Sequence, residues 1–229
     1  MSERRAFHVS TPKTTLVPGR ISPSASAGPQ SLGSLPLVGR ESELRTLVRA
    51  LENGERGASS TTFLAGDGGI GKTRLADTVV NTAMRRGWAT AVGRAYPVET
   101  GVPYALFSDA LLPTLKAMDE ATLSVLSRGG EWELARFFPA LDVAGVASTQ
   151  VRRDASELKA RLLWSFSQFL GRLSARRPLL IVLENLQWAD ASSLELLHFV
   201  ARQLKGQHIA ILCTYNDAQR ESNAALVST

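Results

Sequence analysis

Apolar and polar positions divide this chain into short apolar runs that alternate with longer periodic segments. The runs combine apolar and β-branched residues, as strands buried on both faces of a parallel sheet do. They lie at 61–65, 88–93, 178–183 and 209–213. The periodic segments repeat apolar residues at helical spacing, around 44–53, 72–86, 154–175 and 190–204. This alternation predicts an α/β domain with a parallel sheet.

Residues 103–141 interrupt the alternation between the second and third runs. Aromatic and leucine side chains there, such as Trp132 and Phe137, recur with helical spacing and indicate core packing. We therefore expect a helical insertion at this point, with Pro113 interrupting its first helix.

The first 34 residues have a different composition, rich in Ser, Pro, Thr and Gly. Such a segment buries too little apolar surface to offset the entropy of ordering, so residues 1–34 are expected to be a disordered tail and 35–229 the folded core. The tail carries four basic residues against Glu3, and therefore most of the net charge of +5. We interpret this charge as a solvated tail, because no nucleic-acid-binding motif accompanies it.

Composition narrows the class further. A chain of 229 residues with 44% hydrophobic residues suits one globular domain plus a tail. No apolar stretch reaches membrane-spanning length and no secretory signal is evident, so we expect a cytoplasmic protein without membrane contact. Cys213 is the only cysteine and lies in an apolar run, which indicates a buried core residue.

One loop carries the strongest chemical signal. Residues 66–73 match the phosphate-binding pattern G-x-x-x-x-G-K-[ST], with a strand-like run before them and a helical pattern after them. Glycine backbone can turn its N–H groups toward anionic oxygens, Lys72 can reach the β- and γ-phosphates, and Thr73 can coordinate Mg²⁺. We assign nucleotide binding to Gly66, Asp67, Gly68, Gly69, Ile70, Gly71, Lys72, Thr73 and Arg74.

Hydrolysis also needs polar groups at the carboxyl ends of neighbouring strands. Glu184 and Asn185 directly follow the apolar run 178–183. Glu184 can hold Mg²⁺ directly or through water, so Thr73 and Glu184 are the expected metal ligands. Asn185 can orient a water molecule but cannot accept its proton.

Together these residues carry a resemblance. Val38-Gly39-Arg40-Glu41, the loop at 66–73 and the segment 183–190 (Leu-Glu-Asn-Leu-Gln-Trp-Ala-Asp) resemble the ATPase module of STAND proteins, the signal-transduction ATPases with numerous domains. The module of large LuxR-family transcriptional regulators and of cyclase- or kinase-linked ATPases is especially similar, over residues 35 to 217. The resemblance implies a three-layer, AAA-like P-loop NTPase fold and an ATP/ADP switch that hydrolyses slowly. It also implies that Val38 and Gly39 lie against the adenine and Arg40 near the nucleotide.

The chain departs from the family pattern at two positions. The family strand usually ends in two acids, whereas here Asn185 stands second. In the family's sensor segment an arginine often follows the tyrosine to touch the γ-phosphate, whereas here Asn216 follows Tyr215. An amide brings no charge, so we expect weak hydrolysis from the catalytic set Lys72, Glu184, Asn185 and Asn216. Arg220 or a partner subunit could compensate.

The resemblance also implies the strand order 5-1-4-3-2, of which only four strands are found before Thr229. We therefore expect a core that ends before its last strand and its helical lid, with one edge of the first strand unpaired. An effector domain would lie beyond, and nucleic acid would be contacted only through it.

Other functions stay open. The alternative is a nucleotide-binding interaction module without hydrolysis, whose 103–141 surface recruits a protein partner or a second copy. A small-molecule kinase is less favoured, because the segment 187–190 does not suggest one. A transporter ATPase is disfavoured because the sequence has no Leu-Ser-Gly-Gly-type signature.

Overall fold

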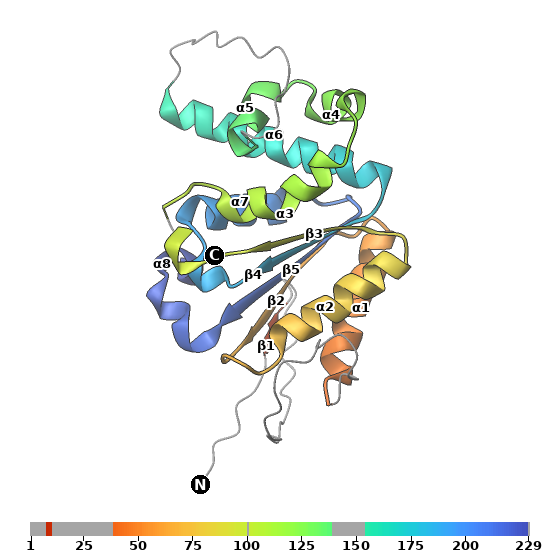
Figure 1. Cartoon of the computed structure of the whole chain (residues 1–229), viewed down its shortest axis with the longest axis vertical. Coiled ribbons are helices and arrows are strands. Elements are labelled where there is room, and N and C mark those ends of the chain that lie inside the picture. The colour runs from red at the N-terminus through yellow and green to blue at the C-terminus, as the bar shows by residue number, and fades with distance from the viewer. Residues whose placement is uncertain (1–7, 11–38, 100, 139–153, 229) are drawn as a thin grey trace.

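The computed structural model describes residues 8–10, 39–99, 101–138 and 154–228, with a five-stranded sheet at its centre (Figure 1). In spatial order the strands are β1 (His8–Ser10), β2 (Ser60–Gly66), β5 (Ile209–Asn216), β4 (Leu179–Glu184) and β3 (Ala89–Arg94). All but β1 are parallel. The expected α/β class is confirmed, and so is the order first, fourth, third, second for the four strands foreseen from the apolar runs.

Helices cover both faces of this sheet and complete three layers (Figure 1). They are α1 (Glu41–Glu55), α2 (Lys72–Arg85), α3 (Ala105–Lys116), α4 (Glu120–Ser127), α5 (Glu131–Phe137), α6 (Ala155–Arg176), α7 (Ala191–Gln203) and α8 (Ala224–Ser228). α1 and α2 lie on one face, and α3 and α7 on the other (Figure 1). α4, α5 and α6 lie beyond α3, so the second face carries the thicker layer.

Strand β4 shows why its sequence is apolar without alternation. Every residue of Leu179–Glu184 is buried, because β3 and β5 pair with both edges and helices cover both faces. Leu180 and Val182 join the core under α1 and α2, whereas Ile181 and Leu183 join the core under α3 and α7. Because the strand is covered on both faces, its last residue, Glu184, is buried as well.

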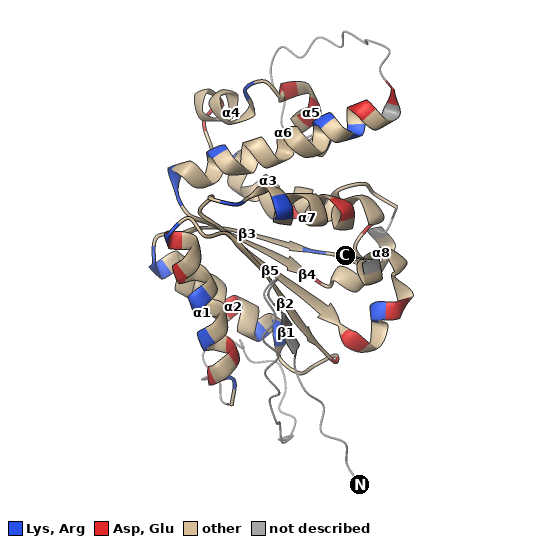
Figure 2. Ribbon diagram, turned by 180° about the vertical axis from the view of Figure 1, so that it is seen from behind, with Lys and Arg blue, Asp and Glu red and all other residues tan. Residues whose placement is uncertain are grey.

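Charged residues lie mainly on the outer faces of the helices. Figure 2 shows acidic and basic residues interspersed along α1 and α6. Among the described residues, no helix has the length and the apolar character needed to cross a membrane.

The insertion between β3 and β4 is helical, as expected, and consists of α3, α4 and α5 before residue 139. Residues 139–141 lie outside the described part of the chain. The expected interruption at Pro113 is wrong, because α3 continues through it to Lys116. Burial of one face of α3, including Phe107 and Leu111, stabilises the helix beyond the local cost of the proline.

The N-terminal segment contributes one strand to the sheet. His8–Ser10 form β1, antiparallel to residues Phe63 to Ala65 of β2, and the expected disorder of residues 1–34 as a whole stays a prediction. Main-chain hydrogen bonds make this pairing, and they do not require the apolar side chains on which the expectation of disorder was based. β1 therefore covers part of the β2 edge that was expected to be unpaired. The other residues of 1–34 lie outside the described residues.

Cys213 lies in the middle of β5 and is fully buried. Burial raises the pKa of its thiol far above the ordinary value, so the reactive thiolate is scarce in the native state. We expect Cys213 to react with a thiol reagent on the order of 10³-fold more slowly in the native chain than in the unfolded chain. Labelling in increasing denaturant, compared with tryptophan fluorescence, checks this. Rapid labelling before the unfolding transition would contradict the burial.

Candidate functional site

The loop between β2 and α2 has the backbone that its glycines permit. Gly69 and Gly71 have φ angles of 77° and 96°, in the left-handed region where other residues are strained. α2 then begins at Lys72, with Gly71 as its N-cap. The loop and the N–H groups of the first helical turn therefore face the same end of the sheet, an arrangement suited to an anion.

Lys72 is held by the loop that it follows. Its Nζ donates to the carbonyl oxygens of Gly66 at 2.6 Å and Asp67 at 2.9 Å. Burial lowers the pKa of Lys72, while the charges of Asp67 and Asp217 raise it. The ammonium group thus lies within the loop and is half-buried, next to Thr73, which is exposed at the start of α2.

Glu184 ends β4 at the same edge of the sheet and is only 2% exposed. Arg94, the last residue of β3, lies beside it in register. Arg94 Nε donates to Glu184 Oε2 at 2.9 Å, and Arg94 Nη2 donates to the same oxygen. The other oxygen, Oε1, is buried and has no hydrogen-bond partner within the described part of the chain.

Asn216 ends β5 and lies beside the loop. It is in register with Gly66, and its Nδ2 is 3.8 Å from the position that a Cβ on Gly68 would occupy. Its Oδ1 accepts from the N–H of Ala218 at 3.1 Å, which turns the amide NH₂ toward the loop. The carboxyl ends of β2, β4 and β5 thus bring Lys72, Glu184 and Asn216 to one edge.

A family model described as AAA ATPase domain matches residues 36–212, more than half of the chain. The chain belongs to this AAA ATPase family. The match includes the loop and Glu184, and it ends inside β5, before Asn216. The description of the family as an ATPase domain agrees with the nucleotide binding expected of the loop at 66–73.

Solved structures that resemble the AAA domain have low sequence identity. The Aeropyrum pernix ORC2 protein, in ADPNP–ADP complexes, is 17% identical with a TM-score of 0.46, covering 86% of this chain and 48% of that chain. Drosophila ORC bound to GC-rich DNA and Cdc6 is 11% identical with a TM-score of 0.37, covering 88% and 60%. The AT-rich DNA complex is 13% identical with a TM-score of 0.40, covering 88% and 59%. This chain thus spans about half to three fifths of those chains. No curated protein sequence matches it.

Arg40 connects the segment before α1 to the loop of the AAA domain. Its Nη2 donates to the carbonyl oxygen of Ile70 at 3.3 Å, and its Nη1 to Glu43 Oε1 at 3.1 Å. Glu43 is buried, so the ion pair fixes the guanidinium beside the loop. Gly39, with φ of 74°, makes the preceding turn, and Val38 lies outside the described residues.

Asn185 occupies a conformation that few other residues tolerate. Its φ is 61° and its ψ 45°, in the left-handed region where asparagine is enriched, and its N–H donates to Thr214 Oγ1 at 3.3 Å. A buried Gln187 then links this turn to the next strand, because its Oε1 accepts from the N–H of Asn216 at 3.0 Å. The Gln187 side chain therefore connects the turn that follows Asn185 to the main chain of Asn216.

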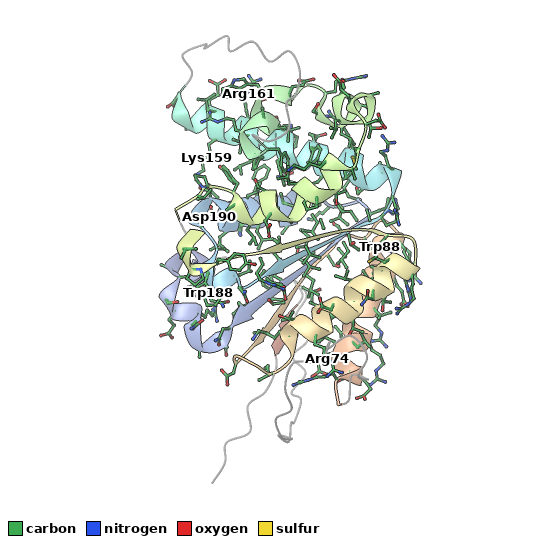
Figure 3. All side chains as sticks on the ribbon, viewed as in Figure 1. Arg74, Trp88, Lys159, Arg161, Trp188 and Asp190 are labelled. Carbon is green, nitrogen blue, oxygen red and sulfur yellow. The ribbon has the colours of Figure 1, made fainter. Side chains whose placement is uncertain are left out.

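The donors at this edge fit a magnesium–nucleotide complex. Glu184 Oε1 is a buried oxygen that needs a partner, and Thr73 supplies a hydroxyl at the start of α2. No group of three or more His, Cys, Asp or Glu occurs among the described residues, in keeping with a metal that takes its other ligands from phosphate and water. In Figure 3, Arg74 lies near the start of α2, and Trp188 lies beyond the carboxyl end of β4.

Two charged residues of the site were missed in the sequence. Arg94 directly follows the expected second strand, and a basic residue at that carboxyl end was the available signal. Asp77 lies one helical turn after Thr73, on the same side of α2. Burial, and then the charge of Glu184, raise the pKa of Asp77, while Arg94 lowers it. Asp77, Arg94 and Glu184 therefore form one charged cluster.

Proposed function

We propose that this AAA domain binds ATP or ADP with Mg²⁺ and acts as a nucleotide switch with slow or weak hydrolysis. The observation that carries the proposal is the meeting of the loop, Lys72, Glu184 and Asn216 at one edge of the sheet. A ligand bound there would contact the loop, the start of α2 and the carboxyl ends of β4 and β5, so its binding could change how these elements are arranged. The motifs shared with STAND proteins favour a bacterial regulator of the LuxR type as the setting.

Each residue has a specific role in this proposal. Loop amides and Lys72 neutralise phosphate charge, and Thr73 and Glu184 hold Mg²⁺, which stabilises negative charge on the phosphate oxygens. Asn216 donates a neutral hydrogen bond to the γ-phosphate. Asn185 orients water without removing its proton, which limits turnover.

Nucleotide affinity and phosphate release, measured together, test the proposal. We expect the chain to bind ATP and ADP with Mg²⁺ and to prefer both to GTP. Slow release of phosphate supports a hydrolysing switch, whereas absence of nucleotide binding contradicts the proposal.

Asn185 offers a gain-of-function test. Aspartate also tolerates left-handed backbone, so Asn185→Asp is expected to fold and to add a group that can accept a proton from water. We expect phosphate release to rise by roughly 100-fold, the lower end of general-base effects. Asn185→Gly is the control, since it keeps the backbone without the carboxylate. An equal rate of phosphate release in both variants would show that the lack of an acid at position 185 does not limit hydrolysis.

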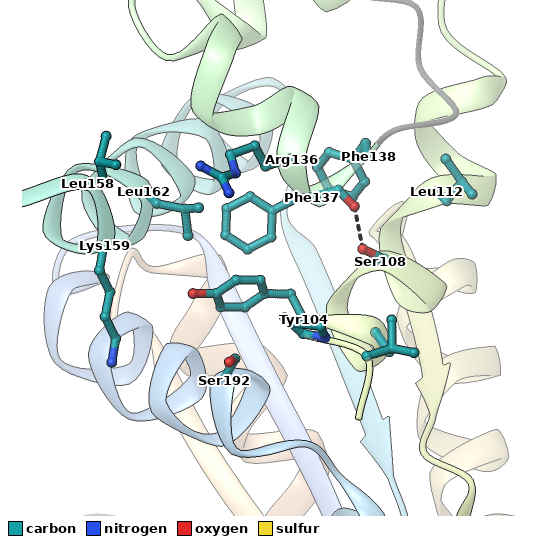
Figure 4. A pocket seen from close by; sticks show the side chains of 13 residues that line it. Tyr104, Ser108, Leu112, Arg136, Phe137, Phe138, Leu158, Lys159, Leu162 and Ser192 are labelled. Carbon is teal, nitrogen blue, oxygen red and sulfur yellow. Dashed lines mark hydrogen bonds between the residues drawn. The ribbon is translucent and has the colours of Figure 1, made fainter. Parts of the chain in front are cut away.

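The alternative is a nucleotide-binding interaction module that does not hydrolyse ATP. A cavity of about 750 Å³ between α3, α5, α6 and α7 favours it (Figure 4). Tyr104, Phe137 and Leu162 line this cavity. The N–H of Tyr104 donates to Asp190 Oδ1 at 3.0 Å, which connects the cavity wall to the segment after Glu184.

The two candidates differ in turnover. Tight nucleotide binding with no phosphate release, in the chain and in Asn185→Asp alike, supports the interaction module. A partner or a second copy of the chain would then bind near the insertion, and nucleotide-dependent sedimentation of the chain, alone and with a candidate partner, tests that.

A further inference from the structure

The ion pair between Arg94 and Glu184 is asymmetric. Both guanidinium nitrogens of the pair, Nε and Nη2, donate to Oε2 of Glu184. Oε1 accepts no hydrogen bond within the described residues, although it is buried. A buried carboxylate normally satisfies both oxygens, so this arrangement leaves one oxygen of Glu184 available for a missing ligand.

Arg94 is itself held in place. Its backbone N–H donates to Asp109 Oδ2 of α3 at 2.9 Å, and β3 pairs it in register with Glu184. Its side chain is 43% exposed, whereas that of Glu184 is 2% exposed. The guanidinium group therefore lies between solvent and the buried site, and it binds the Glu184 carboxylate through Oε2 alone. Tyr96 and Asp77 are the further titratable groups that interact with this pair.

We propose that Arg94 is a positioning residue, which binds Oε2 of Glu184 and thereby directs Oε1 toward the magnesium ion of the bound nucleotide. This inference rests on the proposed function. It adds to the proposed site a residue outside the phosphate loop, and it gives the two oxygens of Glu184 different partners: Arg94 for Oε2 and the magnesium ion for Oε1. Arginine suits this work because its planar fork keeps two donors in fixed geometry on one oxygen.

The test is the Mg²⁺ dependence of nucleotide binding, measured with a fluorescent ATP analogue in the full chain. Arg94→Gln is expected to raise the Mg²⁺ concentration that gives half-maximal nucleotide binding by about 10- to 100-fold. This is the usual cost of losing a residue that orients a metal ligand. Affinity for the analogue in EDTA should stay unchanged. Arg94→Lys should raise this Mg²⁺ concentration less than Arg94→Gln does, because lysine keeps the positive charge. Arg86→Gln is the matched control, since Arg86 pairs with Glu52 and Glu55 at the far end of α2.

A double-mutant cycle covers the case in which Arg94→Gln fails to fold because it leaves a buried charge. Glu184→Gln removes that charge, so Glu184→Gln and the double variant with Arg94→Gln can be compared directly. We expect their Mg²⁺ dependence to be the same, because Arg94 acts through Glu184. A further loss in the double variant, or an unchanged or tighter Mg²⁺ midpoint in Arg94→Gln, overturns the inference. If the unaltered chain binds no nucleotide, the proposed function fails as well, whereas Mg²⁺-dependent binding insensitive to Arg94 refutes this inference alone.

Discussion

Replacing Lys72 with alanine is expected to reduce affinity for Mg-ATP by at least about 100-fold while the fold survives. Lys72 Nζ donates to two loop carbonyl oxygens, at 2.6 and 2.9 Å. The ammonium group therefore already lies at the loop, where a short rotation of the side chain reaches a phosphate. Charge-assisted hydrogen bonds contribute about 1.5–3 kcal/mol each, so the loss of two of them corresponds to roughly 10²–10⁴-fold in affinity.

The fold should tolerate this change because the residue is at the start of a helix and half-buried. Calorimetric titration with ATP measures the affinity, and circular dichroism on heating measures stability. Lys159→Ala is a suitable control, since that lysine is exposed and pairs with Glu195 on α7. Unchanged ATP affinity in Lys72→Ala would show that the loop does not bind the triphosphate.

The loop was predictable because its requirements are local. A strand, a turn that needs left-handed glycines and a following helix all lie within about 25 residues, and each leaves a mark on the sequence. The structure confirms them at Gly69, Gly71 and the start of α2. The buried character of β4 was equally predictable, since a strand covered on both faces is apolar without alternation, as residues Leu179 to Leu183 are.

The rest of the site depends on contacts that sequence spacing does not encode. Arg94 and Glu184 are 90 positions apart and meet only because β3 and β4 are neighbours in register. The same holds for Gln187 and Asn216, which are joined by a side chain across two loops. β1 was missed for a related reason, because its pairing with β2 uses backbone groups that every residue carries.

Gly93→Ala is expected to destabilise the domain by about 3 kcal/mol, the upper end of the usual cost of overpacking. A Cβ at this position would lie 2.3 Å from the carbonyl oxygen of Leu106 and 2.9 Å from the backbone nitrogen of Ala110. Both atoms belong to the backbone of α3, so no side-chain rotation relieves the clash and the helix must move away from β3. In a chain of this size, that loss corresponds to a decrease in melting temperature of roughly 6–12 °C.

Gly101→Ala is the matched control, since no atom lies within 4 Å of the Cβ that it would add. Thermal unfolding of the two variants should therefore separate a packing clash from a general effect of replacing glycine. A displaced α3 also moves Asp109, which fixes the backbone of Arg94, so Gly93→Ala should weaken Mg²⁺-dependent nucleotide binding as well as stability. Equal melting temperatures for the two variants would mean that α3 does not pack against β3 as closely as the structure places it, and the support for Arg94 would be lost with it.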